Sequence, residues 1–478
     1  MRLLEEGGRV KNLKIALVEA CSHTTHIYSR TYLPRVGIPT LAAILKEKGH
    51  ACDIWFQALP GYRQERLLDY DIIGIGSLSG TISDAYRLAG YLKSRGKVVV
   101  MGGPHVSFMP EEALEHCDYV VIGEGEVAFP ALVDGLNQGR LPDSIPGLAY
   151  RLPGGGLQMT AAAKATDMQC LPSPDFTLSP QVRRGKIPPI ITTSRGCPHD
   201  CSFCSVTLMF GRRYRFKPAA QTISELRPVL HRSVCFGDDN FCANPKRAKE
   251  LLREMIRQDA VPLRWSGQMT VQAAMDDEML DLMQRTRCRV MYIGIESVNP
   301  ETLKKYGKAH AFEGIERCIE NLHRHDIGVH GMFVVSADDT LATVEQIGDF
   351  AIATDIDTIQ ICALTPFPGT AAYAEYKHRL LHREWRYFDG MHVVVEPSRC
   401  SALQMQTAIV EQLRRFYSLP RVVGAYRRGR AWRVKYRAGG YYLIRRWAHE
   451  NEDYLRRLQT GFASAHADVA QGAMIAPS

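Results

Sequence analysis

The sequence predicts an α/β protein with a doubly wound parallel sheet, then a partial (β/α)6 barrel of the TIM type, then a helical C-terminal extension. Three observations predict this order. Short apolar runs alternate with helical patterns over the first third of the 478 residues, the alternation resumes after a Pro- and Ser-rich stretch at 171–180, and from about residue 391 the pattern is helical. Strand–helix alternation builds parallel sheets, because a parallel connection needs a crossover. The expected segments are a sheet domain at 1–150, a hairpin and linker at 151–184, the barrel at 185–390, a basic helical region at 391–460 and a disordered tail at 461–478.

The first domain has five predicted strands, each a short apolar run. They cover residues 14–20, 52–56, 71–76, 97–103 and 118–126, with helices at 37–50, 81–95 and 111–116. A hairpin with a glycine turn is expected at 148–158. Ligands of a doubly wound sheet bind beyond the carboxyl ends of its strands. Those ends carry small residues that let a flat or phosphorylated ligand approach the backbone: GSLSGT at 76–81, GGPHVS at 102–107 and GEGE at 123–126.

Six strand–helix units follow the linker and predict the barrel. The strands are expected at 191–194, 233–241, 263–270, 289–297, 328–336 and 356–370, and helices begin near residues 219, 244, 276, 313 and 343. In α/β barrels the reactive groups lie on the loops that follow the strands. The loop after the first strand holds Cys197, Cys201 and Cys204, so we expect these cysteines on the reactive face.

The bulk composition predicts a soluble protein of the cytoplasm. Hydrophobic residues make up 45% of the chain and charged residues 23%, and no apolar run approaches the roughly 18 residues of a membrane span. The N-terminal residues include acids and lack the apolar core of an export signal. Thirteen cysteines cannot all pair, and cytoplasmic thiols stay reduced, so a cysteine cluster indicates metal or redox chemistry.

The cysteine loop has the spacing C-x3-C-x2-C. Thirteen randomly placed cysteines would give only about 0.01 such triplets. Three thiolates can bind three corners of a [4Fe–4S] cluster and leave one iron open to another ligand. A zinc site and inert thiols are the competing interpretations. Structural zinc needs a fourth ligand, and His199 lies between the cysteines rather than after them.

The segment Cys197-Pro-His-Asp-Cys201-Ser-Phe203-Cys204 resembles the radical S-adenosylmethionine superfamily, with an aromatic residue before the last cysteine. In that family the open iron binds S-adenosylmethionine, which then gives methionine and a 5′-deoxyadenosyl radical. The resemblance implies contacts to S-adenosylmethionine from five residues: Phe203, Asp238, Asp239, Gln268 and Glu296. The pair of aspartates would lie near the methionine amino group, and Glu296 near the ribose hydroxyls. The alternative for such residues is a helix cap.

A doubly wound domain before such a barrel resembles the subgroup with an N-terminal cobalamin-binding domain. The resemblance runs over roughly residues 13–418 and rests on the segments at 33–39, 46–50, 77–80, 102–105 and 123–126. It implies cobalamin contacts from Ser77, Ser79, Gly102, Gly103, Gly123 and Glu124. The Asp-x-His-x-x-Gly signature that places a histidine on cobalt is absent. Many members lack it, so cobalamin binding and a sheet without the cofactor both stay open; His23 and His26 are interpreted as loop histidines.

A second alternative is the methylthiotransferase group, whose N-terminal domain supplies three further cysteines to a second cluster. The candidates here would be Cys21, Cys52 and Cys117. Cys21 follows a predicted strand, whereas Cys52 opens one and Cys117 precedes one. The three therefore lie at opposite ends of the predicted sheet, which argues against this alternative.

The positive charge is concentrated near the C-terminus. Residues 414–457 contain thirteen Lys and Arg against three acids, and subtracting this +10 from the net charge of +8 leaves −2 for the rest. A helical cap with a solvated basic face, contact with an anionic membrane surface, and binding of a phosphorylated substrate or RNA are the interpretations. Nucleic acid is the least favoured of them.

Together these resemblances imply a cobalamin-dependent radical enzyme that methylates an unactivated carbon of a small-molecule or lipid-like substrate. The resemblance implies a [4Fe–4S] cluster, S-adenosylmethionine, cobalamin and a reductant such as flavodoxin or ferredoxin. A radical cyclase or rearrangement enzyme of the same architecture is the first alternative. An iron–sulfur electron-transfer or regulatory protein is the second. The expected location is the cytoplasm, with a peripheral position at the inner face of the membrane as one variant.

Overall fold

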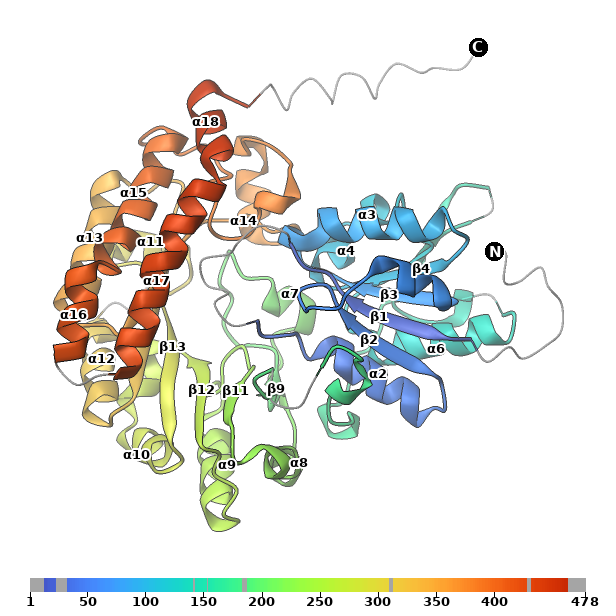
Figure 1. Cartoon of the computed structure of the whole chain (residues 1–478), viewed down its shortest axis with the longest axis horizontal. Coiled ribbons are helices and arrows are strands. Elements are labelled where there is room, and N and C mark those ends of the chain that lie inside the picture. The colour runs from blue at the N-terminus through green and yellow to red at the C-terminus, as the bar shows by residue number, and fades with distance from the viewer. Residues whose placement is uncertain are drawn as a thin grey trace.

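The structure, a computed structural model, describes residues 13–22, 32–140, 142–152, 154–182, 187–308, 313–427 and 431–462. The predictions for His23, His26 and the tail beyond residue 462 therefore lie outside the described residues. Figure 1 shows two α/β bodies side by side, with the C-terminal helices along the flank of the second body. The predicted fold class is confirmed by both sheets.

The first body is built on a seven-stranded sheet with the order β2-β1-β3-β4-β5-β6-β7. Five strands are parallel: β1 (Ile15–Glu19), β2 (Cys52–Phe56), β3 (Ile72–Gly76), β4 (Val98–Gly102) and β5 (Tyr119–Val121). The hairpin predicted at 148–158 forms β6 (Leu148–Arg151) and β7 (Leu157–Met159), which extend the same sheet antiparallel to β5.

Helices cover both faces of this sheet. Helices α2 (Gly37–Glu47) and α6 (Gly125–Asn137) share one apolar core with alternate residues of the strands, including Ile15 and Leu17. On the other face α3 (Ile82–Lys93), α4 (Pro104–Phe108) and α5 (Pro110–Ala113) pack against the remaining residues, such as Ala16 and Val18. Strands buried on both faces read as continuous apolar runs, which is why the sequence predicted them well.

The second body contains six parallel strands in the order β8-β11-β12-β13-β14-β15. They are β8 (Ile190–Ile191), β11 (Ser233–Phe236), β12 (Arg264–Met269), β13 (Cys288–Glu296), β14 (Gly328–Val335) and β15 (Thr358–Ala363). The helices are α7 (Val206–Phe210), α8 (Ala219–Leu226), α9 (Pro245–Arg257), α10 (Asp277–Arg285), α11 (Pro300–Lys305), α12 (Ile315–Arg324), α13 (Leu341–Ala353) and α14 (Ala371–Tyr376). Strands β8 and β15 are the two edges, so the barrel is open between them.

The edge of β15 is covered by the C-terminal extension, which comprises α15 (Ala402–Phe416), α16 (Leu419–Arg427), α17 (Ala431–Glu450) and α18 (Glu452–Thr460). The Tyr417 hydroxyl receives the Ile359 N–H at 2.8 Å and donates to the Ile359 carbonyl at 2.6 Å. The Gly390 carbonyl accepts the Ala363 N–H at 2.8 Å. Such bonds satisfy the edge strand, which would otherwise expose unpaired backbone groups.

Two arginines of the basic segment anchor α17 to the barrel. Arg433 and Arg437 have exposed fractions of only 3% and 0%. Arg433 pairs with Asp357 and, at 2.8 Å, with Asp355. Arg437 donates to the carbonyls of Ile356 and Asp357 just before β15. Part of the positive charge that one interpretation placed on a solvated face is therefore neutralised inside the protein. In the part of the chain that the structure describes, no helix has the length and apolar character needed to cross a bilayer.

The two bodies are joined by buried ion pairs and aromatic contacts. Arg195 of the barrel binds Glu126 of the first body at 2.7 Å, and Arg215 binds Glu124. The Trp385 indole donates to Glu112 at 3.2 Å. One apolar core contains residues of both bodies, among them Val106 and Leu364. The carboxyl edges of the two sheets are consequently held facing each other.

Candidate active site

The cysteine loop lies in a short antiparallel ribbon at the mouth of the barrel. Strands β9 (Ser194–Arg195) and β10 (Arg215–Phe216) pair on either side of it. Gly196, just before the first cysteine, has φ of +89°, and a Cβ there would lie 2.8 Å from the Arg213 carbonyl oxygen. Only glycine fits this position without strain. The sequence does contain a signal for this positive φ, because a glycine stands directly before the first cysteine of the loop.

The three thiols are half-buried and close enough to interact electrostatically. Burial is the main cause that raises the pKa of each thiol; the pKa of Cys204 is raised to about 11, with smaller contributions from the charges of Cys201 and Cys197. The sulfur of Cys197 accepts bonds from the His199 N–H and the Asn240 side chain, and that of Cys204 accepts the Val206 N–H. Donors aimed at sulfur stabilise a thiolate once a metal has displaced its proton.

This donor set fits a [4Fe–4S] cluster. Each cysteine of such a cluster binds a different iron, so the sulfurs surround a cube rather than one point. Among the described residues, no three His, Cys, Asp or Glu side chains converge on a single metal-ion position. The buried Asn240 side chain also leaves its Oδ1 without a hydrogen-bond partner beside Cys197. A buried acceptor without a partner is costly, so this oxygen is suited to accept a hydrogen bond from a ligand bound beside the cysteines.

Asp238 holds the backbone that leads into the cysteine loop. Its carboxylate accepts the N–H and hydroxyl groups of Thr193 at 2.7 and 2.8 Å, and those of Ser194 at 2.5 and 2.9 Å. Asp238 is buried and does not line the cavity described below. Neighbouring Asp239 does line it; burial and the Asp238 charge raise its pKa to about 6.

Glu296, at the end of β13, is bound to a residue that the sequence did not single out. Lys308 donates to it at 2.5 Å, and both side chains are largely buried. Burial alone would lower the pKa of Lys308, but the Glu296 carboxylate and the thiols of Cys201 and Cys204 raise it overall. Glu296 also has a left-handed φ of +66°, unusual for a residue with a side chain. Lys308 thus brings a positive charge close enough to the cysteine thiols to interact with them electrostatically.

The remaining predicted contacts to S-adenosylmethionine lie around the same mouth. Gln268 is exposed, and its backbone carbonyl accepts the Phe241 N–H at 2.8 Å. Phe203 packs edge-on against Tyr306, with ring centroids 4.9 Å apart. Asp239 follows β11, Gln268 lies near the end of β12 and Glu296 ends β13, so the carboxyl ends of three adjacent strands bring these residues to the same edge of the sheet.

A cavity of about 560 Å³ lies between the two bodies. Its first wall is the carboxyl edge of the seven-stranded sheet and includes predicted cobalamin contacts: Ser77, Gly102, Gly103, Gly123 and Glu124. Its second wall comes from the barrel and the cysteine loop, including Thr192, Asp239, Ser205 and Phe210. Ligands bound to the two walls would therefore share one space.

The first wall fits a flat ligand such as cobalamin. The buried Ser77 hydroxyl has no hydrogen-bond partner in the described structure, so it is available to a ligand. Gly103 has φ of +111°, and a Cβ there would lie 2.3 Å from the Ser77 carbonyl oxygen. Glycine lets the β4 loop approach the β3 loop and keeps the wall smooth.

Two predicted cobalamin contacts, Ser79 and Glu124, have partners within the protein. Ser79 is buried and does not line the cavity; its hydroxyl lies 3.0 Å from His105 Nδ1, whose Nε2 lies 3.2 Å from Glu112. Glu124 accepts bonds from Arg215 and from the Thr166 N–H at 2.7 Å. Burial alone would raise the pKa of Glu124, but Arg215 and Arg195 lower it overall.

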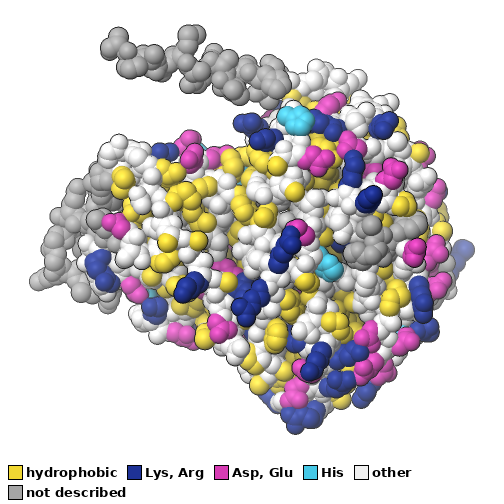
Figure 2. Space-filling view, turned by 180° about the vertical axis from the view of Figure 1, so that it is seen from behind, with side chains coloured by type: hydrophobic (Ala, Val, Ile, Leu, Met, Phe, Trp, Pro, Cys, Tyr) yellow, Lys and Arg dark blue, Asp and Glu magenta, His cyan; other side chains and the backbone are white. Residues whose placement is uncertain are grey.

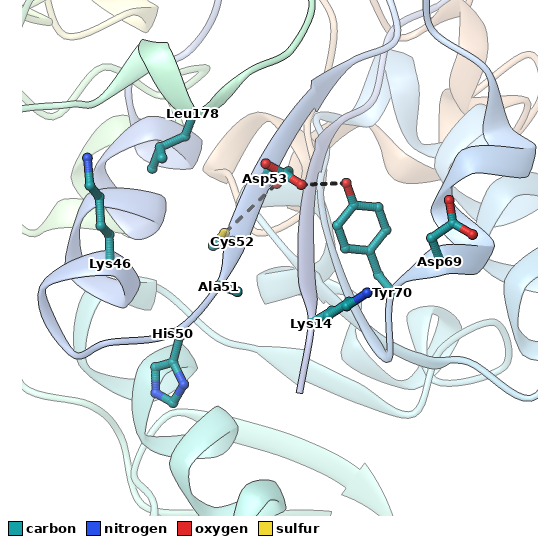
Figure 3. Close-up of a pocket in the computed structure, with 9 residues that line it drawn as sticks. All are labelled: Lys14, Lys46, His50, Ala51, Cys52, Asp53, Asp69, Tyr70 and Leu178. Carbon is teal, nitrogen blue, oxygen red and sulfur yellow. Dashed lines mark hydrogen bonds between the residues drawn. The ribbon is translucent and has the colours of Figure 1, made fainter. Parts of the chain in front are cut away.

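A second cavity, of about 500 Å³, lies at the amino ends of the strands of the first sheet (Figure 3). Lys14 precedes β1 and Cys52 opens β2, so this cavity faces away from the shared space. Its Lys46 and His50 are paired with Asp175 and Asp134 at 3.0 and 2.7 Å. The opposite placement of Cys21 and Cys52 agrees with the argument against a second cluster.

Comparison with known proteins identifies the family. Residues 191–351 match the family model of the Radical SAM superfamily, and residues 25–133 match that of the B12 binding domain. An uncharacterized methyltransferase of Pyrococcus horikoshii is 31% identical over 413 residues, which cover 82% of this chain and 89% of that relative. The chain belongs to the radical SAM superfamily. The predicted subgroup, enzyme class and set of cofactors are confirmed, whereas the residue-by-residue assignments stay predictions.

Other members of the superfamily share its domain arrangement. A bacteriochlorophyllide d C-12(1)-methyltransferase of Chlorobaculum tepidum is 29% identical over 73% of this radical SAM chain and 75% of its own. The structure of TsrM from Kitasatospora setae, solved with cobalamin and a [4Fe-4S] cluster, has a TM-score of 0.62 at 20% identity, covering 77% of this chain and 75% of TsrM. The radical enzyme OxsB without ligands has a TM-score of 0.68 at 15% identity, covering 98% and 82%. These two likenesses show the fold.

Proposed function

We propose that this radical SAM enzyme transfers a methyl group from cobalamin to an unactivated carbon of a small-molecule or lipid-like substrate. The observation that carries the proposal is the shared cavity, which is bounded on one side by the carboxyl edge of the first sheet and on the other by the barrel and the residues that directly follow Cys204. When bound, the cluster with S-adenosylmethionine supplies a radical that removes a hydrogen atom, and methylcobalamin supplies the methyl group. Both must reach the same carbon, so a common space is required.

The chain's own residues have three tasks in this proposal. Cys197, Cys201 and Cys204 hold the cluster, and Asp238 fixes the backbone that leads to them. The Lys308–Glu296 pair holds a carboxylate at the barrel mouth, ready to accept hydrogen bonds from a ligand hydroxyl. The interface pairs of Arg195 with Glu126 and of Arg215 with Glu124 keep the two walls together and exclude water from between them.

The relatives suggest which substrates to try first. Matched relatives include bacteriochlorophyllide d methyltransferases, and others are hopanoid C-3 and C-2 methylases that are 27% and 28% identical to this chain. A tetrapyrrole or polycyclic lipid is therefore the substrate class we propose. A low-potential reductant such as flavodoxin or ferredoxin would supply the electrons. We place the enzyme in the cytoplasm, where its thiols would stay reduced for cluster assembly.

The test is anaerobic turnover by reconstituted protein with reductant, S-adenosylmethionine, methylcobalamin and either bacteriochlorophyllide d or a hopanoid. Methylated product together with 5′-deoxyadenosine and S-adenosylhomocysteine is expected. Deoxyadenosine with an altered, unmethylated substrate would favour a cyclase, and no cleavage of S-adenosylmethionine would contradict the enzymatic proposal. The matched control is Cys201→Ala, compared with Cys170→Ala, an exposed cysteine remote from the loop in sequence. Only the first variant should lose the cluster absorbance and all turnover.

A further inference from the structure

Helix α16 presents an apolar stripe to solvent. Leu419, Val423 and Tyr426 are spaced four and three residues apart, so they share one face of the helix. Their exposed fractions are 53%, 46% and 75%. Ala425, on the other side, is fully buried. Large side chains exposed together in this way are uncommon on a protein surface unless something covers them.

The neighbouring helix α17 adds a cationic face. Helices α16 and α17 pack against each other along the flank of the barrel (Figure 1). On α17, Lys435, Tyr442, Arg445 and Arg446 are exposed, and Arg427 is exposed at the end of α16. Glu450, the last residue of α17, is the only acid in the two helices. On the opposite side of the molecule, basic and acidic side chains are intermingled (Figure 2).

This surface is fixed to the barrel rather than loosely attached. The inward face of α17 contains Arg433 and Arg437, which bind Asp355, Asp357 and nearby carbonyls. Trp432 packs over the start of β14, where a Cβ at Gly328 would lie 2.5 Å from its ring. Two of the arginines of α17 are neutralised inside, and on the outward face Arg446 pairs with Glu450 at 2.7 Å, so the exposed side chains of the two helices keep a net positive charge.

We infer that the outward face of α16 and α17 docks the enzyme on the surface of a membrane that contains anionic lipid. Interfacial helices bury an apolar stripe at the boundary of the acyl chains and place cations beside it for the lipid phosphates. The aliphatic side chains of Leu419 and Val423 favour this partner over nucleic acid, since they neither bind phosphate nor stack on bases as aromatic rings do. The inference concerns attachment and holds whether or not methylation is the reaction.

The experiment is sedimentation of the full-length protein with two kinds of vesicle, pure phosphatidylcholine and phosphatidylcholine with about 30% phosphatidylglycerol. Binding is measured at about 0.05 and 0.5 M NaCl. Two double variants are compared with wild type: Arg427→Glu with Arg445→Glu, and Val423→Ser with Tyr426→Ser. The matched control, Arg87→Glu with Arg257→Glu, makes the same change of charge on the exposed surfaces of α3 and α9.

Wild type and the control are expected to bind the anionic vesicles, more weakly at high salt. The arginine variant should bind at least about tenfold more weakly, because each cation near such a surface contributes measurably to binding. The serine variant should also bind more weakly at both salt concentrations. Equal binding to both kinds of vesicle, or equal loss in the control, would overturn the inference. So would binding of a fluorescent RNA oligonucleotide in place of vesicles.

Circular dichroism and iron content establish that each variant is folded. If the arginine variant fails to fold, the serine variant decides the outcome. Cleavage of S-adenosylmethionine is measured separately, in solution without vesicles. Variants that lose vesicle binding should keep this cleavage, so failure of the docking inference is distinguishable from failure of the proposed function.

Discussion

At the scale of single residues, two neighbouring glycines at the end of β4 have unequal importance. Gly103 has a positive φ, and a Cβ there would overlap the Ser77 carbonyl oxygen. A Cβ at Gly102 would have its nearest neighbour 3.9 Å away. Gly103→Ala should therefore lower the free energy of unfolding by roughly 1–3 kcal/mol and weaken cobalamin binding. Gly102→Ala should do neither to a comparable extent. Thermal unfolding and absorbance titration with cobalamin measure both effects, and equal behaviour of the two variants would contradict the assignment.

His330 offers a second prediction at this scale. Its ring nitrogens lie 2.8 Å from the Thr358 hydroxyl and 3.3 Å from the Gln360 carbonyl oxygen, inside the barrel. Burial lowers its pKa to about 4, although Gln360 partly opposes this. Between pH 6.5 and 4 the unfolded chain therefore binds a proton that the folded protein does not, so stability falls as the pH falls. His330→Gln should show a smaller drop in melting temperature between pH 7 and pH 5.5 than wild type; an equal or larger drop would refute this.

At the scale of elements, the sequence predicted the regular parts of the fold and missed the contacts between them. Continuous apolar runs identified β1 to β5, because strands covered on both faces need no alternation. The cysteine spacing and the flanking strand indicated the cluster loop. Nothing in the sequence showed that Lys308 pairs with Glu296. Nor did it show that the Asp238 carboxylate accepts hydrogen bonds from Thr193 and Ser194. Such pairings depend on how the strand ends are placed, which local patterns do not specify.

The charge of the C-terminal helices shows the same limit. A count of arginines could not separate Arg433 and Arg437, which are buried against Asp355 and Asp357, from Arg427 and Arg445 on the surface. The helical spacing did contain the signal, since positions 433 and 437 are four residues apart and so share a face. Charges mapped onto the helix faces divide this segment into a side that packs against the barrel and an exposed side.

A prediction for the same extension concerns the edge of β15. The Tyr417 hydroxyl is bonded to both the N–H and the carbonyl of Ile359. Tyr417→Phe leaves both backbone groups buried without partners and should destabilise the protein by about 1–3 kcal/mol. Tyr426→Phe, on the exposed face of α16, is the matched control and should leave the melting temperature unchanged. If both variants melt like wild type, the hydroxyl is not needed to cover the edge.

At the scale of the whole molecule, catalysis by two cofactors depends on how firmly the two bodies are held together. Arg195 stands two residues before Cys197 and reaches across to Glu126 at 2.7 Å and Glu124 at 3.5 Å. It thus connects the cysteine loop directly to the first wall of the shared cavity. Removing the guanidinium would leave carboxylates buried with fewer partners at the interface, which is costly.

Arg195→Met should therefore weaken cobalamin binding by about tenfold or more and lower the melting temperature. Arg195→Lys keeps the charge but loses the paired geometry, so its effect should be intermediate. Cobalamin titration is carried out at a temperature where circular dichroism shows all three proteins to be folded. If the methionine variant binds cobalamin as tightly as wild type, the wall of the first body is complete without the barrel. In that case the interface would serve to align the two cofactors rather than to bind one of them, and methyl transfer rather than affinity would be the property lost.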